Sequence, residues 1–119
     1  MKPCYALLMS DLTAKQCKLC EGGVAPLSAD EAQQLAKEIH GDWQISDDGL
    51  EISRTFEFPA YSRSLGFANA VAWIAITQGH HPDIVLSYSR CVVSWTTHAI
   101  GGLSDNDFIC AAKVDALLE

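Results

Sequence analysis

The sequence predicts an α+β domain in which a four-stranded antiparallel sheet is covered by helices on one face. Two pairs of short alternating segments, each joined by a tight turn, indicate β-hairpins. These are 43–46 with 50–58, and 83–89 with 91–97. A long apolar segment, 61–78, separates the hairpins, and capped helical patterns precede and follow them. The predicted order is therefore α-β-β-α-β-β-α.

Composition bounds the class of protein. The chain has 119 residues, enough for one domain with a single core. Its net charge is -7, and its eight Lys and Arg residues are scattered. Because phosphate recognition requires clustered Lys and Arg, this balance argues against nucleic-acid binding. No apolar run approaches the ~20 residues of a membrane span, and no good signal peptide is evident. We therefore expect a cytoplasmic protein without a membrane partner.

Residues 1–27 are predicted to be a flexible, Cys-containing lead-in to a single domain at 28–119. Cys17 and Cys20 form a C-x-x-C motif, typical of half a zinc site or of a redox pair. Zinc needs four ligands, usually from two such pairs, and no second pair exists. A redox pair is expected at the start of a helix in a βαβ unit, which is absent. Five cysteines, an odd number, favour free thiols in a reducing compartment.

The first helix is predicted to begin after Ser28 and to end at Gly41. Ser28 is a good N-cap, and Glu31 three residues later completes a capping box. An apolar stripe follows at Ala32, Leu35, Ala36 and Ile39. The stripe indicates a helix that packs on the core.

The first hairpin turns at Asp47-Asp48-Gly49. Ile52, Phe56 and Phe58 alternate onto one face of its second strand, and polar residues take the other. Arg54 falls on the apolar face. We therefore expect Arg54 either at a sheet edge or paired with a carboxylate.

The central helix is predicted over 61–78 and is apolar nearly all round. One side can cover the sheet, and the other is expected to meet a second subunit, which predicts a homo-oligomer. Gly79 can end the helix and Pro82 prevents it from resuming. His80 and His81 therefore lie on a constrained helix-to-strand corner.

The second hairpin brings a third histidine toward this corner. Its two strands run antiparallel, so its start near Pro82 and its end near His98 lie side by side. Its last strand is expected to place Thr96 and His98 on one face and Thr97 on the other. A final helix follows, with Ser104 as N-cap and Asp107 at N3, where local capping explains Asp107.

Three imidazoles at one corner allow several interpretations. A zinc site is disfavoured because the adjacent His80 and His81 point in different directions and no further ligand has suitable spacing. Covalent catalysis lacks a recognisable Ser or Cys nucleophile. Acid–base chemistry on a small molecule needs only titratable groups near neutrality, which histidine supplies. Purely structural roles at the ends of a helix and a strand stay open at this point.

Several motifs surround the histidines. They are His80-His81-Pro82-Asp83, the aromatic Tyr88, Thr96-Thr97-His98, Gly101-Gly102-Leu103-Ser104 and Asp107, with Trp43, Phe67 in L-G-F-A-N-A-V and the run D-F-I-x-A-A-K. Together they resemble the pterin-4a-carbinolamine dehydratase family over about residues 28–118, and the Cys-containing lead-in resembles its bacterial members. The resemblance implies the fold described above and a homodimer or homotetramer.

The resemblance also implies an activity: dehydration of 4a-hydroxytetrahydrobiopterin to quinonoid dihydropterin and water, which recycles the pterin cofactor of aromatic amino-acid hydroxylases. His80, His81 and His98 correspond to the catalytic set, with His81 and His98 as the acid–base pair and His80 orienting the pterin. Contacts to the pterin are expected from these histidines and from Gly79, Thr96 and Thr97. The pterin is the substrate, so no separate cofactor and no metal is implied.

One position departs from the family pattern. Four residues before the first histidine, where the family usually has a polar residue, this chain has Ile76. A carboxylate there would raise a neighbouring imidazole's pKa or bind the pterin. A non-catalytic binding, assembly or coactivator-like role is therefore an alternative, as is a related use of pterins such as molybdopterin metabolism.

Overall fold

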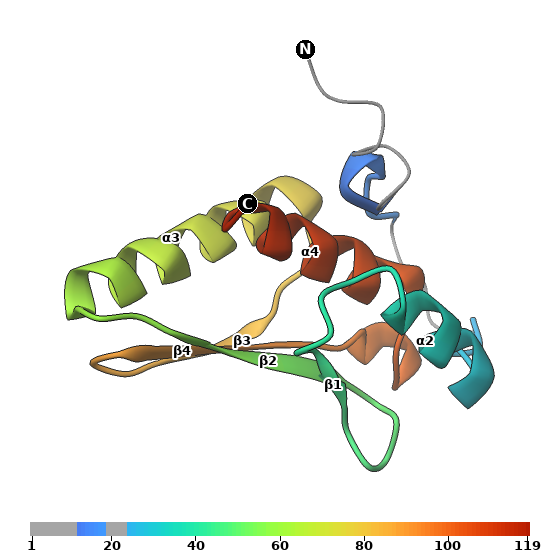
Figure 1. Ribbon diagram of the computed structural model, residues 1–119. Helices are drawn as coiled ribbons and strands as arrows, with labels where there is room; N and C mark the ends of the chain where they lie inside the picture. Colours follow the sequence, from blue (N-terminus) through green and yellow to red (C-terminus); the bar gives the residue numbers. More distant parts are fainter. Residues whose placement is uncertain (1–11, 19–23) are drawn as a thin grey trace.

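Helices cover one face of an antiparallel sheet in the computed structural model, which describes residues 12–18 and 24–119 (Figure 1). The described elements are η1 (Leu12–Ala14), α2 (Ala29–Ala36), β1 (Gln44–Ile45), β2 (Ile52–Glu57), α3 (Tyr61–Gln78), β3 (Asp83–Leu86), β4 (Arg90–Trp95), η2 (His98–Ile100) and α4 (Asp105–Ala116). The predicted order α-β-β-α-β-β-α and the α+β class are confirmed. None of the helices in these two ranges combines the length and apolarity needed to cross a membrane.

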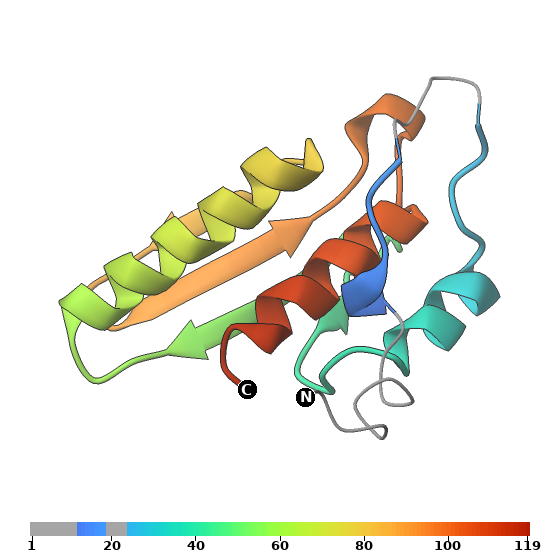
Figure 2. The same cartoon turned by 90° about the horizontal axis from the view of Figure 1, so that it is seen from above.

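The sheet has the order β1-β2-β4-β3, and every neighbouring pair is antiparallel. β2 and β4 form its centre, with Ile52 opposite Trp95 and Phe56 opposite Cys91. These four side chains are buried because α3 and α4 lie side by side across that face (Figure 2). Strand ends differ from prediction by up to three residues, as where β3 ends at Leu86.

Arg54 lies on the central strand β2, not at a sheet edge. Its Nη1 is 2.6 Å from Oδ1 of Asp115 on α4, and its guanidinium lies 4.4 Å from the ring centroid of Phe56. Asp115 also accepts hydrogen bonds from the Trp43 indole and from the His40 backbone. The predicted carboxylate partner is therefore confirmed, and it joins β2 to the end of α4.

The first helix is shorter than predicted. Its capping box forms, since Ser28 accepts from the Glu31 backbone and Glu31 from the Ser28 backbone. α2 nevertheless ends at Ala36, with Lys37 as C-cap, so the predicted end at Gly41 is wrong. The chain tightens there into three-residue turns, in which Glu38 donates to the Leu35 carbonyl.

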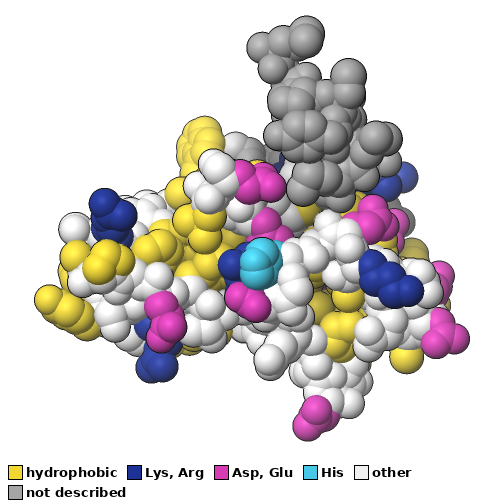
Figure 3. All heavy atoms as spheres, viewed as in Figure 1, with side chains coloured by type: hydrophobic (Ala, Val, Ile, Leu, Met, Phe, Trp, Pro, Cys, Tyr) yellow, Lys and Arg dark blue, Asp and Glu magenta, His cyan; other side chains and the backbone are white. Residues whose placement is uncertain are grey.

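α3 has the predicted bounds and buries only one side. Phe67, Val71 and Ala75 face the core. On the other side, four large hydrophobic side chains are exposed; we call this set the α3 outer face, and it comprises Tyr61, Leu65, Trp73 and Ile76. Hydrophobic side chains gather over this helix in the space-filling view (Figure 3). A helix with two apolar sides thus has one side uncovered in a single chain.

The described part of the lead-in contributes to the core. Leu12 of η1 is fully buried, and the Lys113 ammonium on α4 donates to the Thr13 carbonyl at 2.8 Å. η1 packs on α4 accordingly. The expected division between residues 27 and 28 stays a prediction. Cys20, the second half of the C-x-x-C motif, lies outside the described residues.

Candidate active site

His80 is held on the corner between α3 and β3. Gly79 ends α3 in the left-handed region, at φ 66°, and the His80 N–H then donates to the Ala75 carbonyl. This cap turns the imidazole inward, where it stacks on Trp95 of β4 at 5.5 Å between ring centroids and 10° between planes. The His80 side chain is only 12% exposed. The corner predicted from Gly79 and Pro82 therefore carries one largely buried histidine.

Asp107 is the partner of His80. Its Oδ1 lies 2.6 Å from His80 Nε2, and its carboxylate is fully buried. Its Oδ2 accepts from the Thr97 hydroxyl at 2.8 Å and from the Ser104 N–H at 2.9 Å. The capping box predicted for Ser104 is confirmed. Local capping alone is therefore incomplete as an account of Asp107, because the same carboxylate also holds the histidine.

The hydroxyl groups of Thr96 and Thr97 both form hydrogen bonds with other groups of the protein. Thr97 is buried, and its hydroxyl bonds to Asp107 and lies 2.7 Å from Ser104 Oγ. The Thr96 hydroxyl donates to the Leu50 carbonyl. Thr97 thus contacts His80 only indirectly, because its hydroxyl holds the Asp107 carboxylate that pairs with His80. The expected contacts of Thr96 and Thr97 with a pterin stay a prediction.

His98 does not continue the last strand as expected. β4 ends at Trp95, and His98 opens the turn η2, which closes at Gly101 in the left-handed region. An isolated bridge between Thr97 and Gly102 closes the base of this turn. The strand stops because the chain turns back here into α4, which brings Asp107 beneath the corner.

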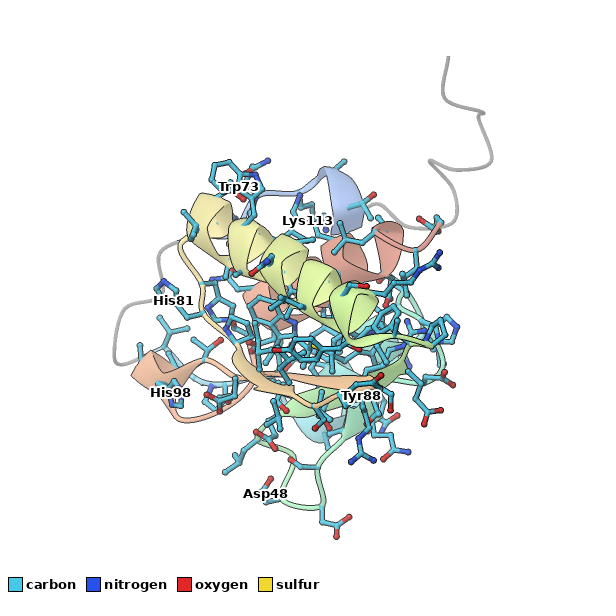
Figure 4. All side chains as sticks on the ribbon, turned by 90° about the vertical axis from the view of Figure 1, so that its left-hand side faces the viewer. Asp48, Trp73, His81, Tyr88, His98 and Lys113 are labelled. Atoms are coloured by element: carbon cyan, nitrogen blue, oxygen red, sulfur yellow. The ribbon has the colours of Figure 1, made fainter. Side chains whose placement is uncertain are left out.

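His81 and His98 are exposed near one another. β3 pairs with β4 so that Asp83 is opposite Ser94, which places His81 and His98 beyond the same end of this hairpin. Figure 4 shows both imidazoles on the same side of the molecule, from the corner after α3 and from η2. The structure therefore brings the three predicted histidines to one end of the sheet, with His80 inside and the other two outside.

A cavity of about 400 Å³ opens beside His98. It is lined by Asp48, Leu50, Glu51, Thr96, His98 and Gly101. The Ser46 hydroxyl and, secondarily, the Leu50 N–H hydrogen-bond to Asp48 and lower the pKa of its carboxyl. The first hairpin thus supplies carboxylates to this hollow, a contribution that sequence reasoning missed because nothing in the hairpin's pattern indicates which strand ends it faces.

Ile76 and Gly79, the two other predicted positions near the histidines, are both exposed. Ile76 is on the α3 outer face, one helical turn before His80, and is 66% exposed. Gly79 is exposed at the corner. Across residues 12–18 and 24–119, no three His, Cys, Asp or Glu side chains gather as a metal site. One charge-paired imidazole beside two exposed ones is an arrangement suited to binding a polar molecule and exchanging protons with it.

Comparisons with known proteins agree on a family. The family described as Pterin 4 alpha carbinolamine dehydratase matches residues 25–117. A Nitrosomonas eutropha protein named as a pterin-4-alpha-carbinolamine dehydratase is 55% identical over 108 residues, covering 91% of this chain and 94% of its own. A Legionella pneumophila protein with the same name is 42% identical over 111 residues, covering 93% and 98%.

Two solved structures share the fold. The crystal structure of a Brucella melitensis transcriptional coactivator/pterin dehydratase has a TM-score of 0.74 and 29% identity, and covers 79% of this chain and 99% of its own. A pterin dehydratase-like RuBisCO assembly factor of the α-carboxysome has a TM-score of 0.57 at 24% identity, covering 66% and 90%, which shows the fold alone. The chain therefore belongs to the pterin-4a-carbinolamine dehydratase family of hydro-lyases.

Proposed function

We propose that this protein dehydrates 4a-hydroxytetrahydrobiopterin to quinonoid dihydropterin and water by histidine acid–base catalysis. The observation that carries the proposal is the placement of three imidazoles at one end of the sheet, one of them fixed by a buried carboxylate. The pterin is the substrate, and the reaction needs no further cofactor. The role of the protein would be to recycle, in the cytoplasm, the pterin cofactor of aromatic amino-acid hydroxylases.

The reaction needs one proton donor and one acceptor. The leaving 4a-hydroxyl must be protonated while a base removes a proton from a ring nitrogen. His81 and His98 suit these roles because both are exposed and neither imidazole has a hydrogen-bond partner among the described residues. Histidine titrates near neutral pH, so one imidazole can give a proton while the other takes one.

His80 suits a different role, which is to bind and orient the pterin. With Asp107 ionised, His80 Nε2–H donates to the carboxylate, and stacking on Trp95 fixes the plane of the ring. A fixed imidazole presents its remaining edge in one direction. Pre-set geometry of this kind lowers the entropic cost of reaching a reactive arrangement.

A stopped-flow dehydratase assay tests the proposal on His81→Ala and His98→Ala. Loss of a general acid or base typically costs about 10²–10⁴-fold in rate. His40→Ala is the matched control, since His40 is an exposed histidine whose imidazole accepts a hydrogen bond from the Asp42 N–H, and its backbone bond to Asp115 survives the substitution. We expect both site variants to lose at least about 10²-fold while His40→Ala keeps the wild-type rate. Near wild-type turnover in both site variants would overturn the proposal.

The exposed α3 outer face supports a homo-oligomer as part of this proposal. An uncovered set of large hydrophobic side chains marks an association surface. Light scattering of the wild-type chain is expected to show a homodimer or homotetramer, and Trp73→Glu, which places a charge on that face, to shift it toward monomer. A wild-type chain that stays monomeric at micromolar concentration would remove this part of the proposal.

The same face favours a second candidate, a non-catalytic binding or assembly function. Such a protein would use the α3 outer face toward a different partner and would leave the histidines idle. Absence of turnover in the assay, together with recovery of a stoichiometric protein partner that Trp73→Glu fails to recover, would favour it over dehydration.

A further inference from the structure

Two thiols from distant parts of the chain meet behind the histidine corner. Sγ of Cys17, in the lead-in, lies 3.5 Å from Sγ of Cys110 on α4. Cys110 is completely buried, whereas Cys17 retains partial access to solvent. The proposed dehydration uses neither sulfur.

Hydrogen bonds between the backbone of residues 17–18 and two side chains hold Cys17 in this place. Its N–H donates to Oε1 of Gln78, at the end of α3, at 2.9 Å. The next residue, Lys18, makes two backbone hydrogen bonds with the side chain of Asn106 on α4. The Lys18 N–H donates to Asn106 Oδ1 at 3.0 Å, and Asn106 Nδ2 donates to the Lys18 carbonyl at 2.6 Å. The contact between the thiols therefore rests on three specific bonds to the ends of two helices.

The two thiols differ in character. The hydrogen bond from Cys110 lowers the pKa of the Cys17 thiol, and the positive charges of His80 and Lys113 act in the same direction, against burial and the charge of Asp107. The same hydrogen bond, together with burial, raises the pKa of the Cys110 thiol. One sulfur is thus disposed to be a thiolate nucleophile, and its neighbour stays protonated beside it.

Cys91 is the natural comparison within the chain. It is completely buried in β4, and burial raises the pKa of its thiol. Among the described cysteines, the thiol–thiol hydrogen bond joins Cys17 and Cys110 and does not include Cys91. Burial alone therefore gives an inert thiol here, and the Cys17–Cys110 contact is what distinguishes the pair.

We propose that Cys17 and Cys110 form a redox-active dithiol site that takes a hydroperoxide as its oxidant and closes to a disulfide. The Cys17 thiolate attacks the outer peroxide oxygen, the O–O bond breaks, and the leaving alkoxide or hydroxide takes up a proton. Cys17 is then a sulfenic acid. The Cys110 sulfur then attacks the Cys17 sulfur, the S–O bond breaks, and the proton of the Cys110 thiol passes to the leaving hydroxide, which departs as water.

The balance of this sequence is two electrons. Two thiols give up two protons and two electrons, and one hydroperoxide is reduced to an alcohol and water, or to two waters for hydrogen peroxide. The sulfurs approach from 3.5 Å to the ~2.05 Å of a disulfide bond, and Cys17 lies in a segment, 14–18, that is mostly exposed. A thiol reductant reopens the bond by exchange.

Closing the bond would fix the lead-in onto α4. The cross-link joins residues that are 93 positions apart and lies next to Asn106, the neighbour of Asp107 in the first turn of α4. We therefore expect Lys15 and Lys18 to be cleaved by trypsin at least about tenfold more slowly in the oxidised chain, because local opening of the segment is suppressed. Equal cleavage rates in the oxidised and reduced chains would contradict the claim that the disulfide fixes this segment onto α4.

Peptide mapping of the full chain identifies the bond. The reduced protein is treated with one equivalent of hydrogen peroxide, blocked, and digested with trypsin and Asp-N without reductant. The expected product joins residues 16–18 to residues 107–113, which contain Cys110 but not Cys91. A product that joins residues 16–18 to the peptide of Cys20, or the absence of any disulfide at Cys17, would overturn the proposal.

Single variants separate the pair from general thiol oxidation. Cys17→Ser and Cys110→Ala are each expected to abolish the linked peptide, whereas Cys91→Ala, which also removes a buried thiol, keeps it. Because Cys110 is in the core, Cys17→Ser is the decisive variant if Cys110→Ala unfolds. If neither the wild type nor Cys91→Ala yields the product that joins residues 16–18 to residues 107–113, the proposed site is contradicted.

Discussion

Oδ1 of Asp107 lies 2.6 Å from Nε2 of His80, although the two residues come from different helical ends and the carboxylate is completely excluded from solvent. A buried carboxylate needs partners for its charge, and Asp107 has them in His80, Thr97 and the Ser104 N–H. The same residue therefore caps α4 and fixes the site.

Asp107→Asn is expected to lower both stability and turnover. Weakening the hydrogen bonds to a buried carboxylate costs roughly 1.5–3 kcal/mol, and the His80 ring loses the group that orients it. Urea unfolding measures the first effect and the dehydratase assay the second. Asp105→Asn is the control, because Asp105 is exposed in the same turn of α4 and should change little. Equal effects of both substitutions would contradict the role of the buried pair.

Gly79→Ala tests the corner through its backbone. Gly79 has φ 66°, and a side chain there would meet no atom within 4 Å, so the cost is conformational strain of about 1–2 kcal/mol. Gly66→Ala is the matched control, since Gly66 lies inside α3 with equally open space and should gain roughly 0.5–1 kcal/mol. Opposite signs in thermal unfolding are expected; stabilisation by both would show that the left-handed cap is not required.

Asp115→Asn tests the support beneath the sheet. It weakens the bonds to Arg54 and Trp43, both largely buried, so we expect a loss of about 2–4 kcal/mol of stability. Asp115 follows Asp107 by eight residues on α4, about 12 Å along the axis, so turnover by the folded fraction should stay within about twofold. A double-mutant cycle with Arg54→Met isolates the pair; a coupling energy near zero would contradict the assignment.

The Cys17 thiol should react at lower pH than its neighbours. Because its pKa is lowered, a larger fraction is thiolate at pH 7 than in an ordinary cysteine, and the thiolate is what iodoacetamide alkylates. Reactivity is therefore retained down to the lowered pKa and falls below it. Removing the hydrogen-bond donor in Cys110→Ala should move the pH profile upward. Slower labelling of Cys17 than of Cys91 at pH 7 would contradict this ordering.

Local signals made much of the fold predictable. α3 has the predicted bounds because Pro59 stops the preceding strand and Gly79 ends the helix, and both capping boxes form where Ser28 and Ser104 indicate them. The predicted end of α2 at Gly41 was wrong because no residue between Lys37 and Gly41 is a strong helix breaker. The boundary instead coincides with the three-residue turns at Lys37 and Glu38.

The site was predictable only as a set of residues. The hairpin pattern placed His80, His81 and His98 at one end of the sheet, but which imidazole turns inward depends on the cap at Gly79 and on the position of α4. The partner of Arg54, Asp115, is 61 residues away along the chain. Such pairings depend on packing between helices and sheet, which no periodicity encodes.

The stacking of His80 on Trp95 gives the site an internal optical reporter. Indole fluorescence is quenched more strongly by a charged imidazolium in face-to-face contact than by a neutral ring, and these planes lie within 10° of parallel. Trp43 is also buried but contacts Asp115, and Trp73 is exposed, so the three indoles emit from different surroundings. The emission of Trp95 would therefore report the state of its contact with His80 without an added label.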